Sequence, residues 1–168
     1  MLQYPVYEVA KGKPIFYKRY KDFQGKSAMM ELPRLDTTLQ AWLKFRLTLL
    51  LGNQLLPKGF DLICGEVGIQ FAANDLRFAD IAVFKDGELE INEHFVQKPP
   101  LITIEIDFRT KAGMEYIFDK VADYHAFGVQ KVIWIFTKNK KVMVAEAGQP
   151  WLTLDWSADV GVVEGAGN

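Results

Sequence analysis

The chain has 168 residues, 49% of them hydrophobic, and a formal net charge of −1. This length and composition fit one folded domain and exclude long disorder. No run approaches the roughly 20 apolar residues of a membrane-spanning helix, and the N-terminus lacks the charged-then-apolar order of a secretory signal. The one cysteine, Cys64, excludes an internal disulfide, so we expect a cytoplasmic protein.

The charges are unevenly distributed along the chain. Residues 1–58 hold ten basic and four acidic side chains, whereas residues 59–98 hold three and eight. A protein that binds nucleic acid by charge alone is usually basic overall, which this chain is not. The distribution still allows a local basic patch beside an acidic, metal-binding one.

The first third of the chain predicts a β-hairpin followed by a helix. Two β-type runs, 4–9 and 14–20, flank the turn residues 10–13, and a polar, basic stretch follows. Asp36 is a suitable N-cap, so we expect a helix over 37–51 that ends at Gly52. The apolar face expected of this helix consists of Leu39, Trp42, Leu43, Leu47, Leu50 and Leu51.

The rest of the chain predicts strands with one further helix. The expected strands are 62–71, 78–84, 101–107, 132–136, 142–145 and a short edge strand within 151–156. Residues 85–100 suggest a turn and a solvated excursion. A helix is expected over 112–127, with Gly128 in the left-handed position and Val129 making the apolar contact that follows it. We therefore predict an α/β domain over 1–160, a mixed sheet flanked by helices, and a frayed tail at 161–168.

Several common types of site are excluded by missing motifs. No phosphate-binding or dinucleotide-binding glycine motif is present, and neither serine lies in a G-x-S-x-G elbow. One cysteine and two histidines cannot make a zinc site of usual spacing. The carboxylates are therefore the better candidates for chemistry.

Two expected strands carry acids among apolar residues. Asp80 interrupts the run 78–84, and period-two alternation in 101–107 places Glu105 and Asp107 opposite the isoleucine face. If the strands are neighbours, the three acids can converge, and a divalent cation would relieve their repulsion. Oxygen ligands favour Mg²⁺, Mn²⁺ or Ca²⁺ over zinc. The alternative is that these acids point into water or pair with basic side chains.

Lys120 is the second unusual residue. It shares one stripe of the second expected helix with Ile117, Tyr124 and Phe127. Either its stem extends along this apolar stripe to a solvated ammonium, or the ammonium points across the sheet toward the carboxylates.

Five segments in this order resemble the Uma-two family of restriction endonucleases, within the PD-(D/E)XK nuclease superfamily. They are Glu66–Ile69, Arg77–Val83, Pro99–Ile106, Asp119–Tyr124 and Phe127–Ile135. The resemblance is good over residues 60–147 and loose over the hairpin and first helix. It implies a restriction-endonuclease-like fold.

The resemblance also implies a site. The family's metal-binding acids fall on Asp80 and Glu105, its helical lysine on Lys120, and an additional acid on Glu66. The superfamily's usual lysine slot holds Asp107, which is either a further metal ligand or a source of excess negative charge. Ala79 replaces the proline of the motif.

The implied activity is Mg²⁺-dependent hydrolysis of DNA phosphodiesters, with Mn²⁺ as an alternative ion. Two other hypotheses stay open: a degenerate nuclease fold that acts as a binding module, and a hydrolase of small phosphate esters. The family implies a homodimer, which cutting both strands would need. DNA contact is expected from the basic stretch, although a solvated loop is the alternative; its residues are Lys18, Arg19, Lys21, Lys26 and Arg34.

Overall fold

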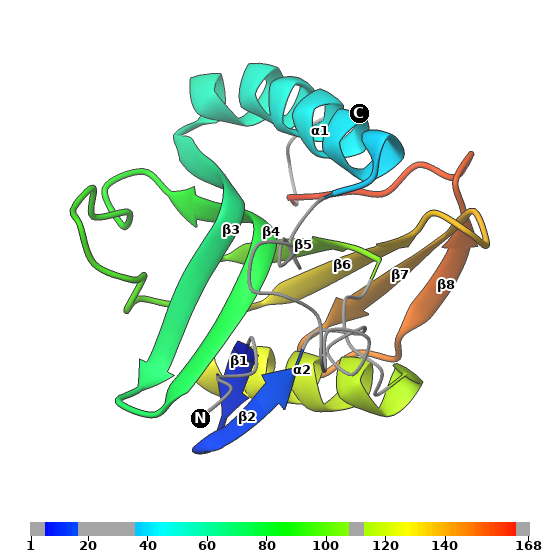
Figure 1. Ribbon diagram of the computed structural model, residues 1–168. Helices are drawn as coiled ribbons and strands as arrows, with labels where there is room; N and C mark the ends of the chain where they lie inside the picture. The colour runs from blue at the N-terminus through cyan, green and yellow to red at the C-terminus, as the bar shows by residue number, and fades with distance from the viewer. Residues whose placement is uncertain (1–5, 17–35, 108–112, 164–168) are drawn as a thin grey trace.

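The computed structural model describes residues 6–16, 36–107 and 113–163. Within these residues, eight strands form one sheet that lies between two helices, α1 above it and α2 below it in Figure 1. The element bounds are β1 Val6–Ala10, β2 Lys13–Phe16, α1 Thr38–Leu55, a 3₁₀ turn at Leu56–Lys58, β3 Phe60–Ala72, β4 Asp75–Lys85, β5 Ile102–Ile106, α2 Gly113–Phe127, β6 Lys131–Phe136, β7 Lys141–Glu146 and β8 Leu152–Asp155. The predicted fold class, a mixed sheet flanked by helices, is confirmed.

The sheet is mixed because β5 and β6 are parallel while every other pairing is antiparallel. Its order is β2-β1-β4-β5-β6-β7-β8, with β3 also paired to β4. β3 pairs with β4 along nearly its whole length, while β5 and β1 pair with β4 at different points. β5 pairs with β4 at residues 81–83, and β1 pairs with it at Leu76. The sheet therefore divides along β4.

Each face of the sheet has its own hydrophobic core. The core on the α2 face includes Ile117, Val121 and Trp134, and the core on the α1 face includes Leu51, Leu55 and the isoleucines of β5. The segment after β8 also packs on the α1 face. Period-two alternation along β5 accounts for both cores, because its isoleucines face α1 while Thr103 and Glu105 face the other way.

The first helix differs from its prediction at both ends. Thr37, not Asp36, is the N-cap: its hydroxyl accepts from Gln40, whose side chain accepts from the Thr37 N–H, a complete capping box. At the other end the helix continues through Gly52 to Leu55. Burial of Leu55 outweighs the low helix propensity of a single glycine.

The expected apolar face of α1 is only half right. Leu43 and Leu47 pack on the core and Leu51 is buried, but Leu39, Trp42 and Leu50 are exposed. α1 thus carries apolar side chains on two sides, and only one of them meets the sheet. Cys64 on β3 is also exposed.

The excursion at 85–100 is solvated as expected, since most of its residues are exposed, but part of its backbone pairs with β3. The N–H of Val96 donates to the Gly68 carbonyl at 2.9 Å, and the Gln70 N–H donates to the Val96 carbonyl at 2.8 Å. Gly68 permits this contact, since a Cβ there would lie 2.5 Å from the Phe95 ring. The excursion therefore covers the edge of β3 that would otherwise be open.

Two predictions on α2 and the tail have different outcomes. Gly128 has a φ of 121° after the last turn of α2, and Val129 behind it is fully buried, as predicted. The end of the expected tail, 164–168, lies outside the described residues.

Two adjacent leucines at the end of α1 test this packing. Leu55 is 1% exposed and Leu56 is 55% exposed. We expect Leu55→Ala to lower the free energy of unfolding by about 2–4 kcal/mol, because it leaves a cavity in the α1 core. The matched variant Leu56→Ala should change it by less than about 0.5 kcal/mol. Urea unfolding measures both changes, and equal losses would contradict the burial of Leu55 and the exposure of Leu56.

Candidate metal and nuclease site

The candidate site fills the gap where the sheet divides along β4. Phe78 lies between the points at which β5 and β1 pair with β4, and side chains replace its ladder hydrogen bonds. Its N–H donates to Glu8 Oε1 at 2.9 Å, and its carbonyl accepts from Lys120 Nζ at 2.6 Å. The Tyr124 hydroxyl lies 3.0 Å from the same carbonyl. Buried polar side chains therefore satisfy the backbone in the gap.

Asp80 and Glu105 come together as predicted. Ile81 pairs with Ile104, so the same antiparallel register places Asp80 opposite Glu105. Asp80 Oδ2 accepts the Ile106 N–H at 2.8 Å, which ties the acid to β5. Both carboxylates are buried in the described structure. The two acids expected to hold a metal are thus cross-strand neighbours.

Lys120 points from α2 across the sheet to Glu105, rather than to the surface. Its Nζ lies 3.1 Å from Glu105 Oε1 and 2.7 Å from Glu8 Oε1, in addition to the Phe78 carbonyl. Its side chain is 0% exposed. The rings of Tyr7, Tyr116, Tyr124 and Trp134 surround the ammonium at 5.6 to 5.7 Å. Three acceptors therefore use all three ammonium protons.

Glu8 is the residue at the centre of this cluster, although its place in the sequence pattern gives no sign of this role. It accepts from Arg77 Nη1 at 3.1 Å and from the Tyr116 hydroxyl at 2.7 Å, besides its contacts with Lys120 and Phe78. Period two would place Glu8 opposite Tyr7, on a solvent face. The register of β1 shifts between Val6 and Glu8, and both Tyr7 and Glu8 are buried.

The ion pairs continue from Glu8 to the surface. Arg77 Nη2 donates to Asp123 Oδ2, and Asp123 Oδ1 lies 3.0 Å from Lys11 Nζ. Burial alone would raise the pKa of Asp123, but the hydrogen bonds from Arg77 and Lys11 lower it below its usual value. Positive and negative groups alternate along this chain of contacts, which keeps the buried charges paired.

Glu105 has an unusual electrostatic environment. Burial raises its pKa to about 7; the Lys120 charge opposes this shift, and the charges of Asp80 and Glu8 add to it. The pKa values of Tyr116 and Tyr124 are also raised well above 10 by burial. Negative charge at Glu105 is therefore only partly compensated by the protein itself.

Asp80 has a basic partner on the other side of the sheet. Lys44 Nζ of α1 lies 2.8 Å from Asp80 Oδ1 and 2.8 Å from Asp36 Oδ2. Burial would lower the pKa of Lys44, but the hydrogen bonds to Asp36 and Asp80 raise it above its usual value. Lys44 lies between Leu43 and Leu47 on the sheet-facing side of α1. A lysine on an apolar helix face is also the pattern that drew attention to Lys120 on α2.

Asp107 does not join Glu105, in contrast to the alternation argument. β5 ends at Ile106, and Asp107 has a φ of 57°, so the period-two pattern does not extend to it. Its Oδ1 accepts from the Thr137 N–H at 2.8 Å, and its Oδ2 accepts from the Thr137 hydroxyl at 2.6 Å and from Gln40 Nε2 at 2.9 Å. In the described structure Asp107 connects β5, β6 and α1.

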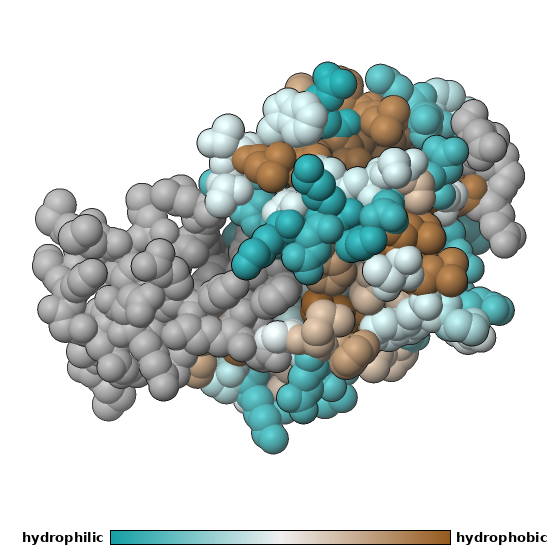
Figure 2. Space-filling model, turned by 90° about the vertical axis from the view of Figure 1, so that its right-hand side faces the viewer, coloured by the Kyte–Doolittle hydropathy of each residue, from teal (hydrophilic) through white to brown (hydrophobic). Residues whose placement is uncertain are grey.

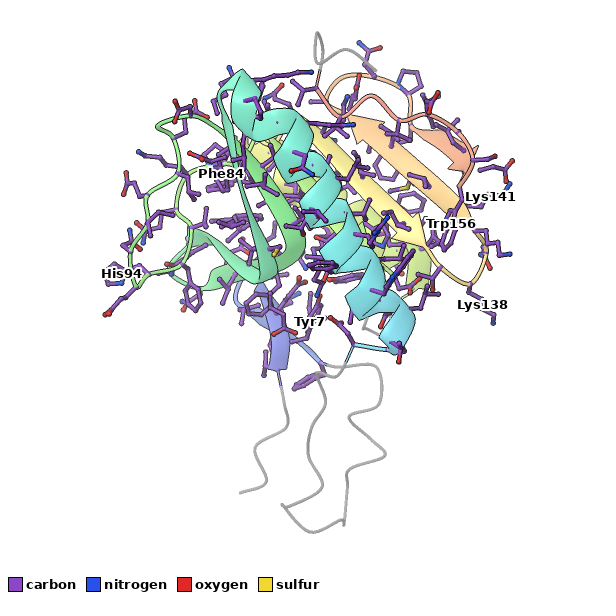
Figure 3. All side chains as sticks on the ribbon, turned by 90° about the horizontal axis from the view of Figure 1, so that it is seen from above. Tyr7, Phe84, His94, Lys138, Lys141 and Trp156 are labelled. Atoms are coloured by element: carbon purple, nitrogen blue, oxygen red, sulfur yellow. The ribbon has the colours of Figure 1, made fainter. Side chains whose placement is uncertain are left out.

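Glu66 is the one remaining predicted site residue that lies in the described part of the chain. Cys64 pairs with Ile81 and Val67 with Ala79, so the bulge that contains Glu66 lies opposite Asp80. The five basic residues expected to contact DNA, 18, 19, 21, 26 and 34, lie outside the described residues. In Figure 3, His94 points outward from the excursion after β4, away from Tyr7 and the hairpin.

The donor set of Asp80 and Glu105 fits a hard divalent cation. Both side chains are carboxylates, they face each other across two strands, and the charge of Asp80 raises the cost of negative charge at Glu105. No group of three His, Cys, Asp or Glu side chains suited to a metal is present among the described residues. Two protein ligands, with water and substrate oxygens as the rest, suit Mg²⁺ better than Ca²⁺.

A family model described as "Uma2: Putative restriction endonuclease" matches residues 18–157. The chain belongs to this family. The structure is also similar to that of a "putative nuclease belonging to DUF820 from Anabaena variabilis ATCC 29413", with a TM-score of 0.67 and 15% identity over 88% of this chain and 75% of that one. A comparison with curated proteins found no match.

Family membership confirms the predicted resemblance, and the similar structure supports the predicted fold. The matched region 18–157 contains Asp80, Glu105 and Lys120 but begins after Glu8. In the described part of the chain, no helix is long and apolar enough to cross a membrane.

The pKa of Glu105 gives the stability of this family member a defined pH dependence. The folded state keeps the Glu105 proton up to about pH 7, whereas the unfolded carboxyl loses it near 4.5. The folded state thus binds more protons in this window, so the free energy of unfolding falls as pH rises from 4.5 to 7, by up to about 3 kcal/mol.

We expect Glu105→Gln to remove this fall, as measured by urea unfolding at pH 5 and pH 8 in a chelator. The matched control is Glu115→Gln, an exposed glutamate on α2, which should keep the wild-type difference. A Glu105→Gln protein with the same fall as the wild type would place the titration elsewhere.

Proposed function

We propose that this protein is a metal-dependent deoxyribonuclease whose site is built on Asp80, Glu105 and Lys120. The observation that carries the proposal is the cross-strand pairing of Asp80 with Glu105, beside the buried ammonium of Lys120 at 3.1 Å. Two carboxylates can hold a divalent ion and an amine beside them can offset negative charge, and both contributions favour phosphodiester hydrolysis. Membership of a restriction-endonuclease family makes DNA the expected substrate.

Each residue has a distinct part in the proposed reaction. Asp80 and Glu105 would hold Mg²⁺ or Mn²⁺, which when bound lowers the pKa of a water and neutralises charge on the phosphate. Asp80 is kept in orientation by the Ile106 N–H, and Glu105 by Lys120. Both oxygens of Asp107 are engaged by Thr137 and Gln40, so the proposal does not require it as a ligand. Glu66, opposite Asp80, stays an accessory candidate.

A second candidate function is a binding module that has kept the nuclease fold without its activity. The observation in its favour is that Lys120 is fully buried, with Glu8 and the Phe78 carbonyl as further acceptors. An ammonium held in this way cannot reach a phosphate without losing a buried partner. Under the first function Lys120 positions Glu105; under the second it only fills the gap in the sheet.

Plasmid cleavage separates these functions. With Mg²⁺ or Mn²⁺ we expect the wild type to nick or cut DNA, and Asp80→Asn or Glu105→Gln to lose at least about 100-fold in rate, because a ligand carboxylate is lost. Lys120→Met should lose activity comparably, with its fold checked by circular dichroism.

The matched control for cleavage is Asp86→Asn, a change at an exposed turn residue after β4, which should keep full activity. Equal rates in all variants would contradict the proposed site. Absence of cleavage by the wild type, together with absence of Mn²⁺ binding in calorimetry, would favour the binding module.

We also propose that the protein is a homodimer joined through the outer face of α1. This face carries Trp42, Phe45, Leu49 and Leu50, which are between 47% and 64% exposed, with Leu39 and Leu56 beside them. Figure 2 shows hydrophobic side chains gathered at the top of the molecule, where α1 lies.

The exposed area of α1 suits a second copy of the chain. At about half exposure, six such side chains present roughly 500 Å² per copy, the greater part of the about 800 Å² that one partner of a stable interface buries. Arg46 lies over the Trp42 ring at 5.8 Å, and Trp and Arg are enriched in interface cores. A self-complementary helix face can pair about a two-fold axis.

Sedimentation measures the proposed dimer. We expect the wild type to sediment as two copies, and Phe45→Glu to raise the dimer dissociation constant at least about tenfold, because it places a charge in an apolar interface. Phe118→Glu is the matched control: Phe118 is 51% exposed on α2, and its replacement should leave the dimer intact. A wild type with the mass of one copy would contradict the proposal.

A further inference from the structure

Lys44 is a second lysine on a helix face that packs against the sheet, and the proposed site gives it no role. It lies on the side of α1 that faces the sheet, among Leu47 and Leu51, and its side chain is only 13% exposed. Its ammonium lies between two carboxylates, 2.8 Å from Asp80 and 2.8 Å from Asp36. The ammonium loses part of its hydration at this position and gains these two ion pairs instead. One of the two is with Asp80, the proposed metal ligand.

We propose that Lys44 is the exchangeable cation of the site: it neutralises Asp80 when no divalent ion is bound, and it turns to a substrate phosphate when the ion takes its place. The inference rests on the proposed nuclease function for its second half only. The first half concerns Asp80 and a metal ion, with or without DNA.

Lys44 suits this role because its surroundings allow movement. Lys120 has three acceptors, one of them a backbone carbonyl, and no exposed surface. Lys44 is partly exposed and carries its charge on a flexible four-carbon stem. The ammonium that can leave is therefore the one on α1.

Asp36 and the Ile106 N–H make the exchange reversible. Asp36, two residues before α1, keeps its contact with the ammonium when Asp80 is released, so Lys44 stays beside the site. Asp80 Oδ2 stays on the Ile106 N–H at 2.8 Å, so the carboxylate keeps its orientation. The ion and the ammonium then compete on the Oδ1 side of the carboxylate.

The exchange has an electrostatic consequence that can be measured. A unit positive charge 2.8 Å from Asp80 Oδ1 opposes binding of a divalent ion at the same carboxylate. Removing that charge should tighten Mn²⁺ binding by about tenfold or more. The same change should weaken DNA binding by about tenfold, because one phosphate contact is lost.

The test measures both affinities on the full chain. Mn²⁺ affinity is measured by calorimetry, and affinity for a short DNA duplex by fluorescence anisotropy in Ca²⁺, with gels to check for cleavage. The variants are Lys44→Met and Lys44→Gln, which remove the charge, and Lys44→Arg, which keeps it. Lys58→Met is the matched control, at an exposed lysine in the turn after α1.

We expect the two neutral variants to bind Mn²⁺ more tightly and DNA more weakly, with Lys44→Arg and Lys58→Met close to wild type. The gain in Mn²⁺ affinity should vanish when Asp80→Asn is added. Circular dichroism confirms the fold of each variant, and the glutamine variant keeps a hydrogen-bonding group if methionine disturbs the core.

Opposite shifts in the two affinities cannot come from a merely structural ion pair, whose loss would weaken both. A fall in both affinities, or an unchanged Mn²⁺ affinity, would therefore overturn the proposal. If no form of the protein binds DNA while the neutral variants still bind Mn²⁺ more tightly, the exchange at Asp80 is supported and the nuclease function fails.

Discussion

The backbone of Phe78 sets the constraint on which the site depends. β4 leaves β5 before it reaches β1, so one N–H and one carbonyl lose their strand partners inside the protein. An unsatisfied buried backbone group costs as much as a lost hydrogen bond. Glu8, Lys120 and Tyr124 supply the missing partners. The same side chains surround Glu105, so the groups that stabilise the divided sheet also form the candidate site.

Charge pairing explains how so many ionised groups are tolerated in the interior. Lys120 lies between Glu8 and Glu105, and Arg77 lies between Glu8 and Asp123. Each buried charge has an opposite neighbour, and the series ends at the exposed Lys11. Such a network adds little net stability compared with an apolar core, but removing one member leaves the others uncompensated. Its residues are therefore coupled in their effects.

Local pattern was enough to predict much of the fold and the three residues of the proposed site. Asp80 and Lys120 stood out because each interrupts an apolar run, and alternation assigned Glu105 to the correct face. Asp107 was placed wrongly because alternation assumes a continuing strand, and its positive φ ends that strand. Glu8 was missed because its partner Lys120 is 112 residues away and alternation along β1 places Glu8 on a solvent face. Lys44 stands among leucines as Lys120 stands among apolar residues, but its ion pair with Asp80, 36 residues away, cannot be read from the local pattern.

The β1–β2 hairpin has a consequence for where the folding unit begins. The family match starts at residue 18, after both strands of the hairpin. A fragment that began at residue 18 would lack Glu8. Two buried positive groups would remain, each with one acid: Lys120 with Glu105 and Arg77 with Asp123. The fragment would also open the β4 edge at Leu76. The region matched by the family model and the region that pairs the buried charges therefore differ by one hairpin, and that hairpin supplies the counter-charge of Glu8.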